Sequence, residues 1–262
     1  MKVRTFSLGL ALALTSIWAP VAVNAAAAAT KLTLGDLLSA NEDKSLELDE
    51  TVDTVAITGD VPVSLQGLDS KIDGRTDRIK IIRRDRSNCE VAAQSRQDDG
   101  VFTIDISGIS PPALSTCNLK IKVVLPRPLN LDVNMKALST DIEGVFRGID
   151  IHAQSASVSF GGVVDGLRVS ADHASVNLES TTKTSHSELD INVDDLSANI
   201  KGAFGKIRID SQNAKVGFDG VADGFQFFAD NASLNLDFAA SMARNAVVLN
   251  AENLVSHVTF NN

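Results

Sequence analysis

The chain has 262 residues, of which 44% are hydrophobic and 5% aromatic, and it carries a formal net charge of −9 at pH 7. This length suits a single domain, and the acidic balance argues against a nucleic-acid partner, because such a partner requires a basic surface. Tyrosine is absent, and the many Ser, Asn, Asp, Gly, Val and Ile residues favour strands and turns over helices.

Residues 1–25 have the features of a secretory signal peptide. Lys2 and Arg4 precede an apolar stretch from Phe6 to Trp18, and Val23 to Ala25 supplies small residues at a cleavage position. The apolar stretch is short for a membrane span of about 20 residues. Cleavage removes two positive charges and takes the net charge from −9 to −11. We therefore expect a bacterial protein that is periplasmic, secreted or on the cell surface, with no transmembrane segment after signal removal.

Residues 26–48 lack any repeat and are expected to form a leader or a short helical cap. Residues 49–128 are expected to be an irregular front part, with strands such as TVAITG (54–59), RIKIIRR (78–84) and VFTIDIS (101–107) but no clean period. This part contains the only two cysteines, Cys89 and Cys117. In an exported chain they predict one disulfide, which would close a loop of about 28 residues and contribute roughly 3 kcal/mol.

Residues 129–262 repeat one pattern seven times. The same inward spacing, at relative positions 0, 2, 4, 7, 9 and 11 and mostly apolar, recurs at steps of 18 or 22 residues, from starts at Leu131, Ile149, Leu167, Leu189, Ile207, Phe225 and Val247. Each unit predicts two strands separated by a polar corner pair. A turn after the second strand places glycine at Gly144, Gly162, Gly202 and Gly220, where the chain is expected to need a positive φ.

Each unit turns its apolar residues to one side, and a single unit cannot bury that side by itself. The units must therefore stack on one another. The sequence therefore predicts an all-β, single-domain parallel β-solenoid, similar to a right-handed β-helix, with coils of 18–22 residues and two main strands per coil. An antiparallel sandwich also has many short strands, but it has no reason to keep one inward spacing over seven units. The first corner residue reads Ala137, Ser155, His173, Asp195, Asn213, Asn231 and Asn253, which predicts an asparagine ladder toward the C-terminus.

The passage VVLPRPLNLDVNMKALSTDIEG (123–144) contains an apolar strand that ends in Pro, a second Pro, a short strand and a coil with glycine at its turn. This layout resembles the putative-adhesin family of exported bacterial β-solenoids of unknown function. The resemblance covers roughly Val52 to Phe260. Members of the family repeat a Ser-Gly-Asp motif at the coil turn, and this chain matches that motif once, at Thr58-Gly59-Asp60. It implies a fold and a binding or scaffold role, and it transfers no catalytic chemistry.

Three groups of residues are candidate sites. The outward face of the second strand is a candidate binding face, made of Ser139, Ser157, Ser175, Asn177, Ser197, Asn199, Ser233 and Asn235; the alternative is an ordinary solvated wall. A candidate basic patch contains Arg75, Arg78, Lys80, Arg83, Arg84 and Arg86; the alternative is a charged edge that discourages strand pairing. Asp172, Asp194 and Asp195, beside His173, form a weak candidate for Ca²⁺, although short polar residues also suit a turn.

We expect a non-enzymatic envelope or surface module that acts in binding or as a scaffold, with no cofactor. Its expected partners are an envelope polysaccharide, an anionic lipid or a protein, and self-association is open. One alternative is a carbohydrate-active enzyme on a β-helix scaffold. The repeated acids Asp165 and Asp223 do not support it, because three coils place them about 14 Å apart, beyond the 6.5–9.5 Å of an inverting glycosidase. The other alternative is a self-assembling structural protein, since open solenoid ends can stack.

Overall fold

The computed structural model describes residues 36–37, 43–60, 63–69, 78–85, 91–108, 119–181, 187–239 and 246–261, all within the unit Thr33–Asn262. The expected signal peptide and both cysteines lie outside the described residues, so export and the disulfide stay predictions. Among the residues that are described, no helix has the length and apolar character needed to cross a membrane.

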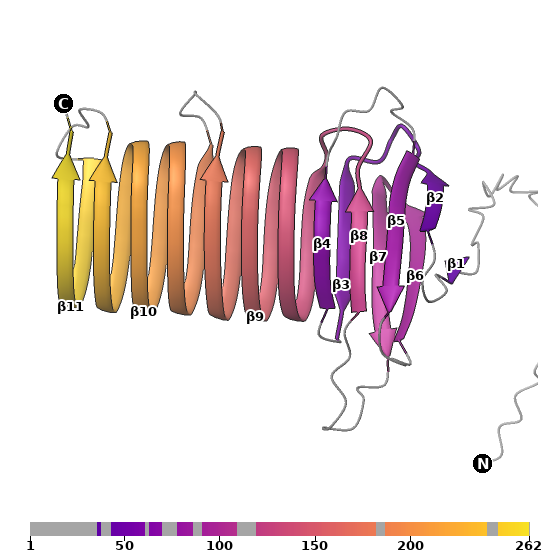
Figure 1. Cartoon of the computed structure of the whole chain (residues 1–262), viewed down its shortest axis with the longest axis horizontal. Helices are drawn as coiled ribbons and strands as arrows, with labels where there is room; N and C mark the ends of the chain where they lie inside the picture. Colours follow the sequence, from indigo (N-terminus) through magenta and orange to yellow (C-terminus); the bar gives the residue numbers. More distant parts are fainter. Residues whose placement is uncertain are drawn as a thin grey trace, which may run out of the picture. The chain divides into compact units, whose positions relative to one another are not determined.

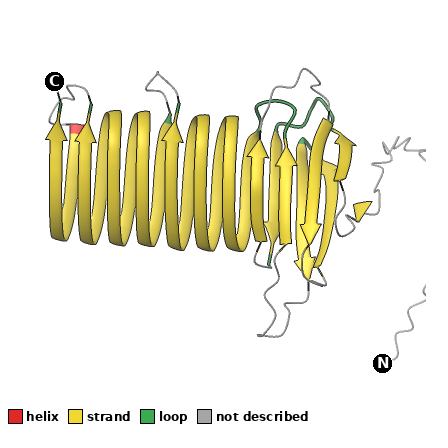
Figure 2. Cartoon of the chain, viewed as in Figure 1, coloured by secondary structure: helices red, strands yellow, loops and turns green. Residues whose placement is uncertain are grey.

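The described part of the chain is all-β, as its composition predicts, apart from one helical residue at Ala246 (Figure 2). The strands are β1 (Asp36–Leu37), β2 (Asp43–Glu47), β3 (Thr54–Gly59), β4 (Val63–Asp69), β5 (Arg78–Asp85), β6 (Val91–Asp98), β7 (Val101–Gly108), β8 (Leu119–Val124), β9 (Asn130–Ser180), β10 (Glu188–Phe238) and β11 (Val247–Phe260).

The long strands β9 and β10 wind through several successive coils, and β11 adds a last one (Figure 1). β10 pairs in parallel with β9, with Leu189 opposite Leu167, and β11 pairs in parallel with β10, with Val247 opposite Phe225. Both pairings have the 22-residue step that the sequence pattern contains. Side-chain bonds between coils also follow the 18-residue step, as from Arg168 to Asp150.

The predicted inward positions form the core of this winding. Strand geometry alternates side chains between the two faces, and the corner pair resets the alternation so that both strands of a coil face the same interior. In the unit that begins at Leu167, the inward residues Leu167, Val169, Ala174, Val176 and Leu178 are buried, and Ala171 is partly buried against them. Toward the C-terminus, the rings of Phe218, Phe225 and Phe238 pack with centroids 5.1–5.8 Å apart. This continuous apolar interior is the main stabilising feature of the stack.

The turn glycines adopt the backbone conformation that the sequence predicts. Gly144, Gly162, Gly202 and Gly220 have φ values of +119°, +146°, +117° and +157°. Non-glycine residues rarely adopt such values. The turns of neighbouring coils can therefore approach closely. Gly162 lies on Gly144 and Gly220 on Gly202 at steps of 18 residues, and Gly202 lies on the backbone of Ser180 at a step of 22.

The front part continues both walls of the coils. β3 lies between β9 and β7, and β4 lies between β9 and β8, all in parallel (Figure 1). Beyond them, β6 and β5 run antiparallel to β7 and β8, and the short strands β1 and β2 follow at the edges. β6 was not predicted, because its described inward residues are the small Ala93 and Ser95, which give no apolar alternation.

The structure departs from the sequence interpretation at two places in this front part. The described residues of 26–48, expected to be a leader or a short helical cap, include the strands β1 and β2 and no helix, and Leu48 is buried in the core. In β5, alternation places Arg83 on the inward face with Ile79 and Ile81, and Arg83 is only 4% exposed. Arg83 therefore does not belong to an exposed basic patch.

A clamp within the front part fastens the residues just before β9 to the loop before β3. Arg127 Nη2 donates hydrogen bonds to the carbonyl oxygens of Asp49, Glu50 and Val52, over 3.1, 3.2 and 2.7 Å. The Asp49 carboxylate in turn accepts bonds from the backbone N–H and the hydroxyl of Thr51, each over 3.0 Å. These bonds, the backbone one first, lower the pKa of Asp49, because they stabilise the ionised form.

Candidate functional site

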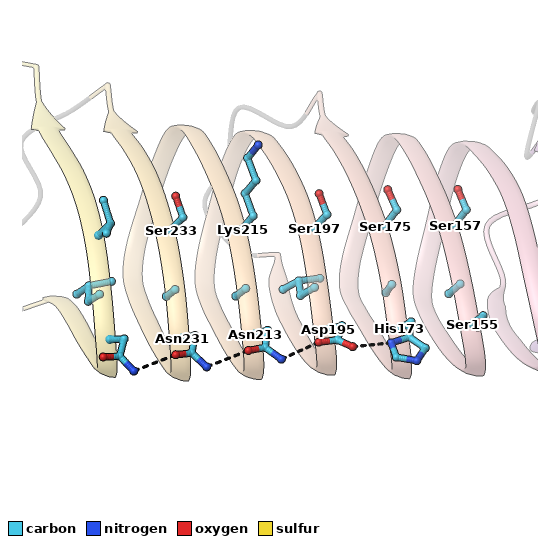
Figure 3. Close-up of a pocket in the computed structure, with 18 of the residues that line it drawn as sticks. Ser155, Ser157, His173, Ser175, Asp195, Ser197, Asn213, Lys215, Asn231 and Ser233 are labelled. Carbon is cyan, nitrogen blue, oxygen red and sulfur yellow. Dashed lines mark hydrogen bonds and ion pairs between the residues drawn. The ribbon is translucent and has the colours of Figure 1, made fainter.

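A groove of about 1390 Å³ runs along the corner between the two strands of each coil and crosses all seven coils (Figure 3). Three columns of side chains recur along its length. The corner column contains Ala137, Ser155, His173, Asp195, Asn213, Asn231 and Asn253; the floor contains Leu138, Ala156, Ala174, Leu196, Ala214, Ala232 and Leu254; the wall contains Ser139, Ser157, Ser175, Ser197, Lys215, Ser233 and Val255.

The corner column forms the predicted ladder of hydrogen bonds. Asn253 Nδ2 donates to Asn231 Oδ1 over 2.9 Å, Asn231 Nδ2 donates to Asn213 Oδ1 over 3.0 Å, and Asn213 Nδ2 donates to Asp195 Oδ1 over 2.8 Å. On the other side, His173 Nδ1 lies 2.8 Å from Asp195 Oδ2 (Figure 3). The carboxylate of Asp195, which accepts on both oxygens, is the point where the ladder from the C-terminal coils meets the histidine.

The floor gives the groove its depth. Ala156, Ala174, Ala214 and Ala232 are inward-facing but 7–9% exposed, more than the apolar residues deeper in the core. A methyl group at these positions leaves space that a larger side chain would fill. The floor is therefore apolar, and it is recessed between the two polar columns at the four coils that have alanine there; Leu138, Leu196 and Leu254 occupy the same position in the other three coils.

The structure places all eight residues of the predicted binding face on the exposed surface. Five of them, the serines, form the wall of the groove. Asn177, Asn199 and Asn235 form the next outward column and do not line the groove, and Asn199 donates a hydrogen bond to Asn177 over 3.2 Å. The predicted face therefore contains one wall of a site whose floor and corner column the sequence interpretation did not connect to it.

The groove combines an apolar floor with two mostly uncharged columns of hydrogen-bonding side chains. The carboxylate of Asp195 is paired with His173 and Asn213, and Lys215 and Glu252 are the other charged groups in the lining. Amides and hydroxyls recur at the coil spacing of about 4.8 Å, and each can donate and accept. The groove therefore suits a ligand with regularly spaced hydroxyl or amide groups and little charge.

The basic segment of β5 does not form a comparable surface. Arg78 and Lys80 are exposed, and Lys80 Nζ lies 3.5 Å from a carboxylate oxygen of Asp43 on the neighbouring strand β2. Arg83 is buried. Arg75, Arg86 and the side chain of Arg84 lie outside what the structure describes.

The predicted carboxylates of the Ca²⁺ candidate face two different depressions. Asp172 and Asp194 line a smaller depression of about 580 Å³, together with Asp60 and His152. Asp195 lines the groove instead. Among the described residues, no cluster of three or more His, Cys, Asp or Glu side chains could hold a metal ion.

No protein-family model and no curated protein matches this chain. Several solved structures are similar to it, among them the following three. A putative adhesin from Bacteroides fragilis is 12% identical and covers 86% of this chain and 97% of its own, with a TM-score of 0.30. A putative lipid binding protein from Parabacteroides distasonis is 13% identical and covers 87% and 94%, with a TM-score of 0.33. A putative cell adhesion protein from Clostridium sporogenes is 10% identical and covers 84% and 98%, with a TM-score of 0.27. TM-scores this low establish neither a family nor a function.

Proposed function

We propose that this chain is a parallel β-solenoid that acts after export as a non-enzymatic binding module, and that its groove holds an extended, uncharged polysaccharide of the bacterial envelope. The observation that carries the proposal is the continuity of the groove, whose three columns repeat over all seven coils. The parallel pairing of β9, β10 and β11 at coil-length steps supports the solenoid assignment. Export rests on the N-terminal sequence alone.

The regular spacing favours a polymer over a compact ligand. Each coil presents one corner group and one wall group at a rise of about 4.8 Å, which is close to the length of one sugar unit. A chain of sugars that lies along the coil axis would therefore meet the same pair of polar columns at every unit. Its hydroxyls would bond to the serines, and its less polar ring faces would cover the alanine floor.

The charges of the lining favour a neutral ligand over an anionic lipid. Lys215 is the one lysine or arginine that lines the groove, and Asp195 and Glu252 add negative charge. The basic segment that was the sequence-based argument for an anionic partner has its Arg83 buried. An anionic headgroup would therefore gain little from this surface.

The spacing of the carboxylates in the groove supports a binding role over catalysis. Asp195 and Glu252 lie on coils that are three levels apart, about 14 Å at the coil spacing. Paired carboxylates of retaining and inverting glycosidases lie about 5–9.5 Å apart. Asp195 is also held by His173 and Asn213, so it has few free lone pairs for a substrate.

The test is binding of the purified mature chain to an array of envelope glycans, with anionic lipids on the same array. One variant replaces Ser157, Ser175 and Ser197 with Gln, which fills the wall of three consecutive coils. The control variant replaces Asn134, His152 and Asn192 with Gln; these exposed residues line the smaller depression on the first strand. We expect a neutral glycan to bind the wild type and the control but to bind the serine variant at least about tenfold more weakly.

Binding that survives the serine substitutions, or that is lost equally in the control, would contradict the assignment of the groove. Binding of anionic lipids alone would contradict the ligand class. Release of shortened oligosaccharides during the assay would contradict the non-enzymatic role.

A further inference from the structure

The last coil of the winding, β11, has an open edge. It pairs with β10 on one side, and no other described strand pairs with it. β11 is 14 residues long, so a row of backbone N–H and C=O groups is left for another strand. A long edge of this kind is a template for association unless charges, prolines or a cover protect it.

The outward side chains of β11 differ from those of every coil before it. One outward column on the first strand reads Asp132, Asp150, Arg168, Asp190, Arg208, Gln226 and then Val248. The wall column carries serine or lysine in six coils and ends in Val255. Val248 is 42% exposed and Val255 is 74% exposed. Both columns therefore change from polar or charged to apolar only at the open edge.

The other end of the described unit is protected in the usual ways. Its edges are β1, with two residues, and β2, with five residues that include Asp43, Lys44 and Glu47. Both strands run antiparallel to their neighbours β6 and β5. An incoming β11 would find short, charged edges there, so this end is a poor partner for stacking head to tail.

We propose that β11 is a dimerisation surface, where a second copy of this chain pairs tail to tail through a two-fold axis at the coil corner. The inward spacing 0, 2, 4, 7, 9, 11 reads the same in both directions. A flipped copy of β11 therefore keeps inward positions over inward positions, with Val247 opposite Val258, Ala251 opposite Leu254 and Leu249 opposite Ser256 of the second copy. Such an interface is self-complementary and closes at two subunits.

The distribution of charge favours this meeting point. Each copy has a net charge of −9, or −11 once residues 1–25 are removed, so the net charge of two copies opposes their association. Between Val247 and Phe260, Glu252 is the one acidic residue, and there is no lysine or arginine. Val248, Leu254, Val255 and Phe260 are the exposed large hydrophobic residues of the described part, and all four lie on β11.

Analytical ultracentrifugation of the full mature chain over a wide concentration range tests this proposal, which is independent of any ligand in the groove. The wild type is expected to be in a monomer–dimer equilibrium. The double variant Val248→Lys, Val255→Lys places charges on the edge and should weaken the dimer at least about tenfold. The matched control is Ser233→Lys, which lies in the wall column one coil before β11 and should leave the dimer unchanged. The wall column tolerates lysine, because Lys215 already occupies it.

Cross-linking tests the register. Asn250 lies opposite the partner's Val255 in this geometry, so an equimolar mixture of Asn250→Cys and Val255→Cys proteins should form disulfide-linked dimers, and Val255→Cys alone should not. A wild type that is monomeric throughout, open-ended oligomers, or equal dimer affinity in the lysine variants and the control would each overturn the proposal. Monomers whose β11 amides resist hydrogen exchange would also overturn it, because another segment of the same chain would then cover the edge.

Discussion

Replacement of Gly162 by alanine gives a direct test of how the coils approach each other. Gly162 has a φ of +146°, and a Cβ there would overlap the carbonyl oxygen of Gly144 on the neighbouring coil and lie 2.9 Å from its C and N atoms. The obstacle is backbone, so no side chain can move aside. The unfavourable φ costs about 1–3 kcal/mol, and a displaced turn weakens at least one bond between coils, about 1 kcal/mol. We expect the free energy of unfolding to fall by about 2–4 kcal/mol.

Gly166 provides the control in the same turn. An added Cβ at Gly166 meets nothing within 4 Å, and its φ lies outside the left-handed region. Gly166→Ala should therefore change stability by less than about 1 kcal/mol, and a small gain is expected because alanine restricts the unfolded chain. Urea unfolding followed by circular dichroism measures both variants. Equal stability of the two would refute the close contact between the turns that the structure shows.

Two further variants probe the corner ladder and the clamp. Asn231→Ala removes one bond that Asn231 donates and one that it accepts, and should lower the free energy of unfolding by about 1–2 kcal/mol; no loss in urea unfolding would mean that the ladder adds no stability. The bonds from Thr51 lower the pKa of Asp49 below 3.8, so their stabilisation is present above pH 3.8 and is lost as the pH falls through the lowered pKa. Asp49→Asn should therefore be less stable than the wild type at neutral pH, with a difference that shrinks in acid; a constant difference across an acid titration would contradict this.

The regular coils could be predicted because each of their requirements appears locally in the sequence. Inward positions must be apolar, corners must be polar, and the close turns need glycine, so the spacing of Leu167, Val169 and Val176 and the position of Gly162 carry the register. The front part could not be predicted in the same way. Its strands stack in the spatial order β9, β3, β7, with β4 and β8 on the other wall, which differs from their order in the chain. No period survives such a rearrangement.

The site was predictable only in part, for a similar reason. The exposed serines follow from alternation along a strand, and the asparagine ladder follows from the alignment of corner residues. The groove depends on the size of the floor residues relative to both columns, which becomes visible only when Ala156 and Ala174 are placed between them in space. The burial of Arg83 was missed because a charged side chain was taken as outward-facing, whereas the alternation with Ile79 and Ile81 already placed it inward.

The two polar columns of the groove contribute differently to stability and to binding. Each amide in the middle of the corner column donates one bond to the preceding coil and accepts one from the next, so part of its hydrogen-bonding capacity already holds the stack together. The serine hydroxyls of the wall stand on the exposed side of the strand, where a ligand replaces water. A ligand group gains more at a hydroxyl that it can engage fully than at an amide that is already bonded twice. The corner column therefore helps to fix the spacing of the coils, and in the proposed binding mode the serine wall would use that spacing for recognition.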